Sequence, residues 1–270
     1  MTTTVPDLQR PASLAASTLG IARRSLLKFL RTPQLVLIGT VQGAMFLLIF
    51  RYVFGGAIGA GGLSYVDFLV PGFVTAGVLF GAIGAATGMA EDLDQGFVDR
   101  LRSLPIPRSA VLAGRALADT AMQVWGLAIT VAIGFAVGFR LHGSVGGALA
   151  AFGLLVVLGF AFEWLFIWIG LLAGNAQAAQ GMAFLAVVLP LTFVSSAYVP
   201  VATMPGWLQA FAEHQPVTIM VDAVRVLTQG QAAEALLGHG AGWYVVRALA
   251  WSAAILATFG PLAVARYRRG

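Results

Sequence analysis

The chain has 270 residues and a net charge of +5; 59% of its residues are hydrophobic and only 10% are charged. Soluble domains usually carry about 25% charged residues, so this composition is typical of a protein that faces lipid. The sequence has no cysteine, which excludes disulfides, Cys-based zinc sites and iron–sulfur clusters. The basic residues flank apolar segments, so we expect them to face anionic lipids and not nucleic acid.

Residues 12–31, within a cytoplasmic N-terminus of residues 1–34, are predicted to form an amphipathic helix. Apolar side chains recur on one face at helical spacing, and Arg24, Lys28 and Arg31 fall on the opposite face. Such a helix lies in the membrane surface, with its basic side chains toward the lipid headgroups. It is either an orientation signal alone or a lever that touches a cytoplasmic partner.

Six apolar segments are long enough to cross a membrane as helices. They lie at 35–54, 66–90, 111–139, 148–173, 181–202 and 243–265, with a short uncharged loop at 174–180. Lys and Arg gather before the first segment, between the second and third, and in the tail 266–270, so both termini are expected in the cytoplasm. The prediction is an all-α integral membrane protein with a six-span domain over 35–265.

Two connections stand out from the others. At 91–108 acidic residues precede basic ones, and Pro105 and Pro107 end a short helix that has an apolar edge. This loop is either solvated, as most charged segments are, or docks into a groove on another protein. The external segment 203–242 contains a helical stretch at 217–227 that is too short and polar to span, so we expect it to be re-entrant or to lie on the surface.

The sequence lacks the motifs of an enzyme. A phosphate-binding loop of the GxxxxGK[ST] type needs a lysine after glycine, and the only lysine, Lys28, follows leucine. The three histidines lie in predicted loops and form no HExxH or comparable metal pattern, and there is no GxSxG elbow. We therefore expect no catalytic residue, metal or cofactor in this chain.

Glu163 lies near the middle of the fourth predicted span. A charge there costs about 2.5–3.5 kcal/mol even on the lenient insertion scale, so it should face protein or water. It either contacts a cationic substrate or serves a proton-linked step, or it makes a buried structural hydrogen bond to another span, for example through Gln123. Arg115 and Asp119, four residues apart at the start of the third span, are interpreted as a structural pair.

Four segments resemble type-2 ABC-transporter permeases of the daunorubicin-resistance group of actinobacterial exporters. They lie at 50–58, 65–72, 91–119 and 199–230, and the third and fourth are the more specific. One departure is that Gly43 follows Gln42, where the group commonly has proline. A bend in the first span is therefore expected to be softer here.

The resemblance implies the permease subunit of an ABC exporter that moves amphiphilic antibiotics or lipids across the bacterial cytoplasmic membrane. Two separate ATPase subunits would hold ATP and Mg²⁺, and a second permease, a copy or a paralogue, would complete the complex. An external re-entrant helical hairpin would lie between the fifth and sixth spans. The residues that would contact the ATPase, beside the 12–31 helix, are Glu91, Asp92, Gly96, Phe97, Arg100 and Leu101.

Gln42, Phe46 and Phe50 recur at four-residue spacing, on one face of the first span. We predict that they line the substrate path together with Glu163; lipid contact or core packing is the alternative for the first three. The alternative function is an ATP-independent secondary transporter or channel, which would predict more intramembrane charge and often an internal repeat. A membrane enzyme and a structural subunit that only anchors an ATPase are further alternatives.

The substitution Glu163→Gln is expected to change the transport of cationic substrates more than the amount of protein in the membrane, because it removes an intramembrane carboxylate. Efflux of a cationic and a neutral substrate at matched protein levels measures this. Unchanged transport of both substrates would exclude Glu163 from the path.

Overall fold

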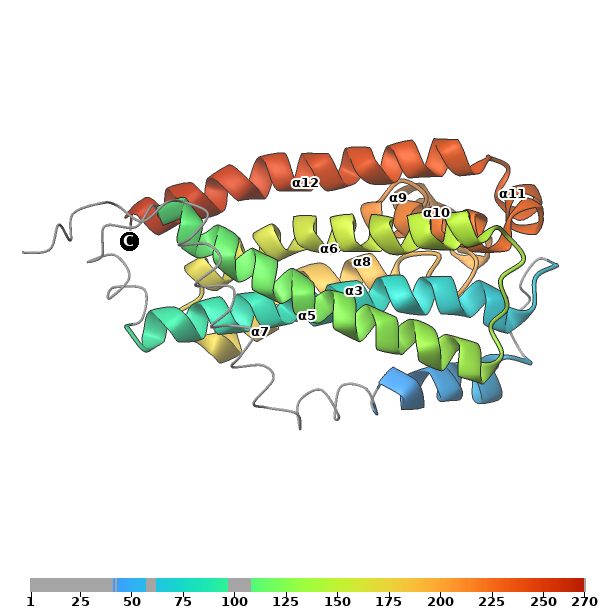
Figure 1. The fold of residues 1–270 in the computed structure, drawn as a ribbon, viewed down its shortest axis with the longest axis horizontal. Coiled ribbons are helices and arrows are strands. Elements are labelled where there is room, and N and C mark those ends of the chain that lie inside the picture. The colour runs from blue at the N-terminus through green and yellow to red at the C-terminus, as the bar shows by residue number, and fades with distance from the viewer. Residues whose placement is uncertain (1–40, 42, 57–61, 97–107, 270) are drawn as a thin grey trace, which may run out of the picture.

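The computed structural model describes residues 41, 43–56, 62–96 and 108–269, and this part of the chain is helical without a strand. Five of the described helices are long and apolar enough to cross a membrane. They are α3 (Tyr65–Asp94), α5 (Arg108–Val137), α6 (Val145–Leu172), the continuous unit of α7 (Ala176–Ala183), η2 (Phe184–Val188) and α8 (Leu189–Phe193), and α12 (Ala241–Arg269). They run side by side along an elongated bundle (Figure 1). The all-α prediction is confirmed for these residues.

The remaining predicted span, at 35–54, is the first in the chain. Only part of it lies within the described residues. A shorter apolar helix covers Gly43–Phe54, and its last turn is the π-helix η1 (Phe50–Phe54). The predicted helix at 12–31, with Arg24, Lys28 and Arg31, lies outside the described residues. The same holds for four of the predicted site residues, Gln42, Phe97, Arg100 and Leu101.

The bundle has two distinct ends (Figure 1). At the C-terminal end, α3 ends, α5 begins, α6 leads into α7, and α12 ends. At the opposite end, called the α10 end below, α3 begins, α5 leads into α6, and α12 begins. The short helices α9 (Gly206–Ala212), α10 (Pro216–Gln229) and α11 (Gln231–Leu237) lie at this end, after the 3₁₀ turn η3 (Val201–Thr203).

Helices α3 and α6 form the centre of the bundle. They pack on each other; α6 also contacts α12 and α10, and α3 also contacts α5, α7 and α10. The most apolar part of α3 is 67% buried, whereas that of α5 is only 11% buried. Small residues allow this close packing, as at Gly170 of α6, where an added Cβ would meet the backbone of Ala86 and the Cβ of Met89 on α3.

The ladder of hydrogen bonds in α3 is interrupted at Pro71, which has no amide hydrogen. The Thr75 hydroxyl donates to the Pro71 carbonyl (2.8 Å), one turn further on. Gly72 lies directly against the backbone of Ala197, and a Cβ at position 72 would collide with it. The segment that follows α8 therefore touches α3 backbone to backbone.

The prediction for the fifth span is wrong in its limits. The helix occupies Ala176–Phe193, so it begins inside the predicted loop 174–180 and ends well before residue 202. The early start has a local cause, because the Asn175 side chain accepts a hydrogen bond from the Ala178 amide (2.8 Å) and caps α7. After α8, the Ser195 hydroxyl accepts from the Ala197 amide (3.1 Å) and stabilises a non-helical turn.

The helix predicted at 217–227 exists as α10 and is slightly longer, covering 14 residues. Pro216 is its first residue, where a missing amide hydrogen is harmless. Gly230 ends it with a φ of 62°, a conformation that glycine adopts without strain. Nearly all of α10 is buried against α3, α6 and α12. Protein therefore surrounds most of this helix.

The substitution Gly72→Ala is expected to lower the stability of the folded protein by about 1–3 kcal/mol, because the new methyl group forces the Ala197 backbone away. Thermal unfolding of the purified protein in detergent measures the change. Gly77→Ala is the matched control on the same helix, since nothing lies within 4 Å of a Cβ there. Equal melting temperatures for the two variants would contradict the close approach of α3 and residue 197.

Candidate functional site

Two of the predicted path residues, Phe46 and Phe50, belong to an aromatic cluster. The aromatic cluster consists of Phe46, Phe50, Phe54, Phe73, Phe193 and Tyr198. The ring centroids of Phe46 and Phe50 are 5.0 Å apart, and Phe50 stacks on Tyr198 at 4.9 Å. Phe73 stacks with Phe46 at 6.3 Å. The cluster thus joins the first described helix, α3 and the end of α8.

One side of the aromatic cluster is open. Phe46, Phe54 and Phe193 are exposed, whereas Tyr198 is buried beneath them. The first described helix also exposes other large apolar side chains, namely Val41, Met45, Leu48, Ile49, Tyr52 and Val53. Apolar surface of this extent is typical of a face that meets lipid, another subunit or an apolar ligand.

Glu163 lies inside the subunit, with an exposed fraction of 1%. Its Oε2 accepts a hydrogen bond from the Thr120 hydroxyl of α5 (2.7 Å). Gln123, suggested above as its partner, instead lies against Gly159 of α6, and its amide donates to the Val78 carbonyl (3.4 Å). The suggested donor was wrong because the register of α5 places Thr120, and not Gln123, opposite Glu163. Glu163 does not belong to the aromatic cluster.

At the C-terminal end, Arg115 connects α3 with α5. It forms an ion pair with Asp92, donates to the Gly88 carbonyl (2.9 Å) and lies 3.4 Å from the Asp119 carboxylate. The interpretation of Arg115 and Asp119 as a pair is confirmed, and Asp92 is added to it. All three side chains are more than four-fifths buried, so the charge of Asp92 is compensated inside the chain.

The other described residues of the predicted coupling region lie next to this ion-pair cluster. Glu91 is in the last turn of α3, and Gly96 follows the C-cap of that helix at Gln95. Gly96 has a φ of 64° and its amide donates to the Leu93 carbonyl (3.0 Å), which closes the end of the helix. The structure therefore places Glu91, Asp92 and Gly96 together where α3 leaves the bundle.

Arg225 of α10 is a fully buried charge, with an exposed fraction of 0%. Its Nη1 donates to the Asp222 carboxylate (2.7 Å), and its Nη2 donates to the carbonyls of Phe68 (3.0 Å) and Ser196 (2.9 Å). The guanidinium also lies over the Phe68 ring, 3.8 Å from its centroid. One side chain therefore joins α10, α3 and the segment after α8.

A second group of hydrogen bonds ties the same segment to α10. The Ser196 hydroxyl donates to Asp222 (2.8 Å), and its amide donates to the Thr218 hydroxyl (3.3 Å). The side-chain amide of Gln215 donates to the carbonyls of Leu191 (3.0 Å) and Val194 (3.2 Å). The carbonyls freed where α8 ends are thus satisfied by side chains of α10 and its N-cap.

The far end of α10 is bound to the loop between α5 and α6. The backbone amides of His142 and Gly143 donate to the Thr228 carbonyl (3.1 and 2.8 Å). The side-chain amide of Gln229 donates to the Arg140 carbonyl (3.0 Å). The Arg140 amide in turn donates to Asp67 at the start of α3 (3.0 Å). Sequence reasoning missed this network and the Arg225 site, although polar residues do recur on one face of α10.

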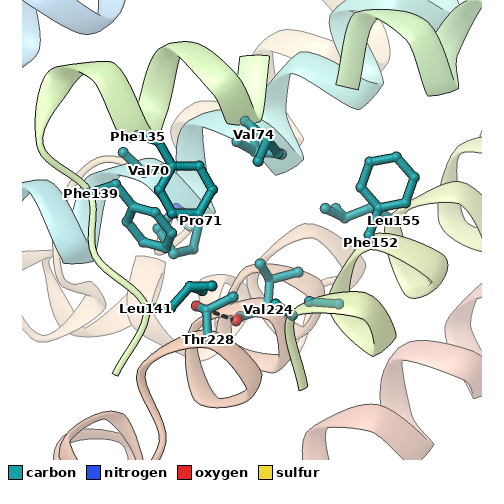
Figure 2. Close-up of a pocket in the computed structure, with 13 residues that line it drawn as sticks. Val70, Pro71, Val74, Phe135, Phe139, Leu141, Phe152, Leu155, Val224 and Thr228 are labelled. Carbon is teal, nitrogen blue, oxygen red and sulfur yellow. Dashed lines mark hydrogen bonds between the residues drawn. The ribbon is translucent and has the colours of Figure 1, made fainter. Parts of the chain in front are cut away.

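Beside α10 lies an apolar cavity of about 80 Å³, bounded by α3, α5, α6 and α10. Figure 2 shows the rings of Phe135 and Phe139 on one side, Phe152 and Leu155 on another, and Val224 below them. The only side-chain oxygen in its lining, that of Thr228, donates to the carbonyl of Val224 (2.8 Å) in its own helix. The cavity therefore offers apolar contacts only.

In the described part of the chain, no group of three or more His, Asp and Glu side chains could hold a metal ion. The features present are an open aromatic surface, a buried ion pair that fixes an internal helix, and an ion-pair cluster at the opposite end. Together with the apolar spans, they define a multi-pass helical membrane protein with an exposed apolar face.

The chain belongs to the ABC-2 type transporter family, whose model matches residues 17–228. It is 34% identical, over 96% of its length and 89% of the relative's, to the daunorubicin resistance ABC transporter permease protein DrrB1 of Streptomyces coeruleorubidus. It is 26% identical, over 84% of its length and 83% of the relative's, to the probable doxorubicin resistance ABC transporter permease protein DrrC of Mycobacterium tuberculosis. A putative transport permease of Porphyra purpurea, ycf38, is 26% identical over 77% of the chain and 72% of its own length.

The family confirms the expected resemblance and the expected class of function. The chain is a permease subunit of an ABC transporter, and such a subunit works with an ABC ATPase on a separate protein and with a permease partner. It is a multi-pass membrane protein.

The substitution Arg225→Met is expected to destabilise the protein by about 3–5 kcal/mol, because it leaves the buried Asp222 charge without its cation. Thermal unfolding and the monodispersity of the purified protein report this. Arg247→Met is the control, since Arg247 is exposed on α12, with its guanidinium stacked on Trp243 (3.8 Å). If both variants melted at the same temperature, Arg225 would not be what holds α10 in place.

Proposed function

We propose that the chain is the membrane subunit of an ABC exporter that moves amphiphilic small molecules, antibiotics or lipids, out of a bacterial cell. The observation that carries this proposal is the 34% identity, over nearly the whole chain, to a permease named for daunorubicin resistance. The open aromatic cluster supports it, because aromatic rings give an amphiphile with an aromatic body a surface to stack on.

In the proposed orientation, both termini are cytoplasmic and the α10 end faces outward. The first described helix is then part of a sixth span, and the distribution of Lys and Arg supports this arrangement. Helix α10 has 14 residues and is about 21 Å long, which is too short to cross the hydrocarbon core. We assign α9 and α10 to a re-entrant hairpin that enters from outside and returns there through α11.

The complex would contain two ATPase subunits, which hold ATP and Mg²⁺, and a second permease, either a copy or a paralogue. We assign the ATPase contact to the six coupling residues named from the sequence, together with the helix at 12–31. Asp92 has a more specific role in this scheme. Since it pairs with Arg115, it would hold the coupling loop to both α3 and α5, so motion of the ATPase would reach both helices together.

We place the substrate path along the aromatic cluster and Gln42, between the two permease subunits. The exposed apolar face of the first described helix supports this placement, because it has no cover within the described residues. The burial of Glu163 and its hydrogen bond to Thr120 favour the structural alternative for that residue.

The proposal is tested by co-expressing the chain with a candidate ABC ATPase and measuring ATP-dependent daunorubicin uptake into inside-out vesicles. Phe50→Ala is expected to raise the apparent KM about 3- to 10-fold, since removing a stacked ring costs roughly 1 kcal/mol. Trp125→Ala is the matched control, because Trp125 is exposed on α5, away from the aromatic cluster.

The same preparation tests the coupling region. Arg100→Ala should reduce co-purification of the ATPase, or uptake per ATP hydrolysed, while leaving the amount of permease unchanged. Uptake that proceeds without ATP, from a chain that retains no ATPase, would overturn the proposed function. An equal effect of Phe50→Ala and Trp125→Ala would overturn only the assignment of the path.

A further inference from the structure

The apolar cavity beside α10 lies where α5 and α6 separate. Towards the C-terminal end the two helices touch through Thr120 and Glu163, and through Gln123 and Gly159. Towards the α10 end they diverge, with α3 behind them (Figure 1). Phe135, at the cavity wall, is 39% exposed, and the cavity is partly open. An acyl chain can therefore enter it where α5 and α6 diverge.

The size and lining of the cavity restrict what can enter it. Its volume of about 80 Å³ is roughly half that of the 150 Å³ engineered cavity that stays dry and takes up benzene. Its walls are Val, Leu, Phe, Ala and Pro side chains and one internally bonded threonine. A few methylene groups at the end of an alkyl chain fit these conditions, whereas water and a fused ring system do not.

A basic side chain, that of Arg140, lies next to this cavity. The Nη1 of Arg140 donates to the carbonyls of Phe135 (3.3 Å) and Phe139 (2.9 Å), the two residues whose rings line one wall. The backbone of Arg140 is fixed by hydrogen bonds to Asp67 and Gln229, so the position of its side chain is set by the fold.

The guanidinium of Arg140 forms no ion pair with a carboxylate in the described part of the chain, and its side chain is exposed. The neighbouring His142 is exposed as well, with its Nδ1 2.8 Å from Gln229. A charged donor at the end of a membrane span, above an apolar cavity, is complementary to a lipid phosphate.

We propose that an anionic phospholipid binds between α5 and α6 in the leaflet at the α10 end. Its phosphate would contact Arg140, and the end of one acyl chain would fill the apolar cavity. The site is separate from the proposed substrate path, because Val70 and Val74 of α3 face the cavity while Phe73, between them, faces the aromatic cluster. The proposal does not depend on which side of the membrane that leaflet faces.

A bound chain would contact Val224 and Thr228 of α10, the residues that flank the Arg225 anchor. It would therefore fill the gap beside these two residues. Occupancy is expected to raise the melting temperature of the protein, because the ligand binds the folded state alone.

The test uses the full chain in nanodiscs that contain trace phosphatidylglycerol, or trace phosphatidylcholine, each with a diazirine at the end of one acyl chain. After illumination, mass spectrometry locates the labelled residues. We expect labels on the cavity wall, at Phe135, Phe152 and their neighbours, with phosphatidylglycerol favoured about fivefold over phosphatidylcholine.

Two substitutions separate the parts of the site. Ala148→Leu places a larger side chain in the cavity and should remove the labelling by both lipids, whereas Ala150→Leu, on the exposed face of the same helix, should not. Arg140→Gln should keep the labelling but abolish the preference for phosphatidylglycerol, and Arg247→Gln serves as its control. If Ala148→Leu does not fold, Ala148→Val should lower the labelling in part.

Three outcomes would overturn the proposal. The first is labelling of the cavity wall no stronger than that of the exposed faces of α5 and α12. The second is equal labelling in Ala148→Leu, or Ala148→Val, and the unaltered chain. The third is a headgroup preference that survives Arg140→Gln, which would show that Arg140 does not bind the lipid phosphate. Each can occur while ATP-dependent export is intact, so failure here is distinct from failure of the proposed function.

Discussion

The buried pair of Arg225 and Asp222 is the interaction on which the α10 end depends. Burying two charges is costly, and hydrogen bonds to the remaining donors and acceptors offset that cost. Here the carbonyls of Phe68 and Ser196 and the hydroxyl of Ser196, which lie on two other segments, supply these bonds, whereas the Nε of Arg225 is buried without a partner. The pair can therefore be accommodated only when α10, α3 and the turn after α8 are all in place. This requirement makes the arrangement specific, which apolar contacts in a lipid environment could not do by themselves.

Helix α3 connects this anchor to the other cluster of charges. At its first turns it supplies the Phe68 carbonyl to Arg225, and at its last turn it supplies Asp92 to Arg115. Between these points Pro71 interrupts its hydrogen bonds, and Gly72 brings its backbone against residue 197. Helix α3 is thus held by a contact with an arginine at each end, and one of its backbone hydrogen bonds is missing at Pro71. Such a helix is suited to bend at Pro71 when the C-terminal end of the bundle is displaced. In an ABC permease that displacement would originate at the ATPase.

Much of this could be predicted from the sequence, and the errors have identifiable causes. Apolar runs and basic flanks predicted the helices because burial in lipid depends on composition alone. The limits of the fifth span were wrong because a single cap at Asn175 decided them. The Arg225 site was missed although Thr218, Asp222 and Arg225 recur at four- and three-residue spacing, a polar face on an otherwise apolar helix. That pattern marks a buried polar contact, but its partners at Phe68 and Ser196 are set by tertiary packing, which one sequence does not encode locally.

The two faces of α3 show why similar apolar residues come to serve different purposes. Phe73 points to a cluster of rings that is open at the surface, whereas Val70 and Val74 point to a small apolar cavity that admits only a chain end. Rings exposed on the first described helix can stack with bulky amphiphiles of many shapes, since stacking is tolerant of the outline of the partner. A small cavity held by the Arg225 anchor cannot adjust in this way, because the segments that form its walls are tied together by buried hydrogen bonds. Helix α3 can thus serve a tolerant substrate path with the side chain of Phe73 and a selective lipid site with those of Val70 and Val74.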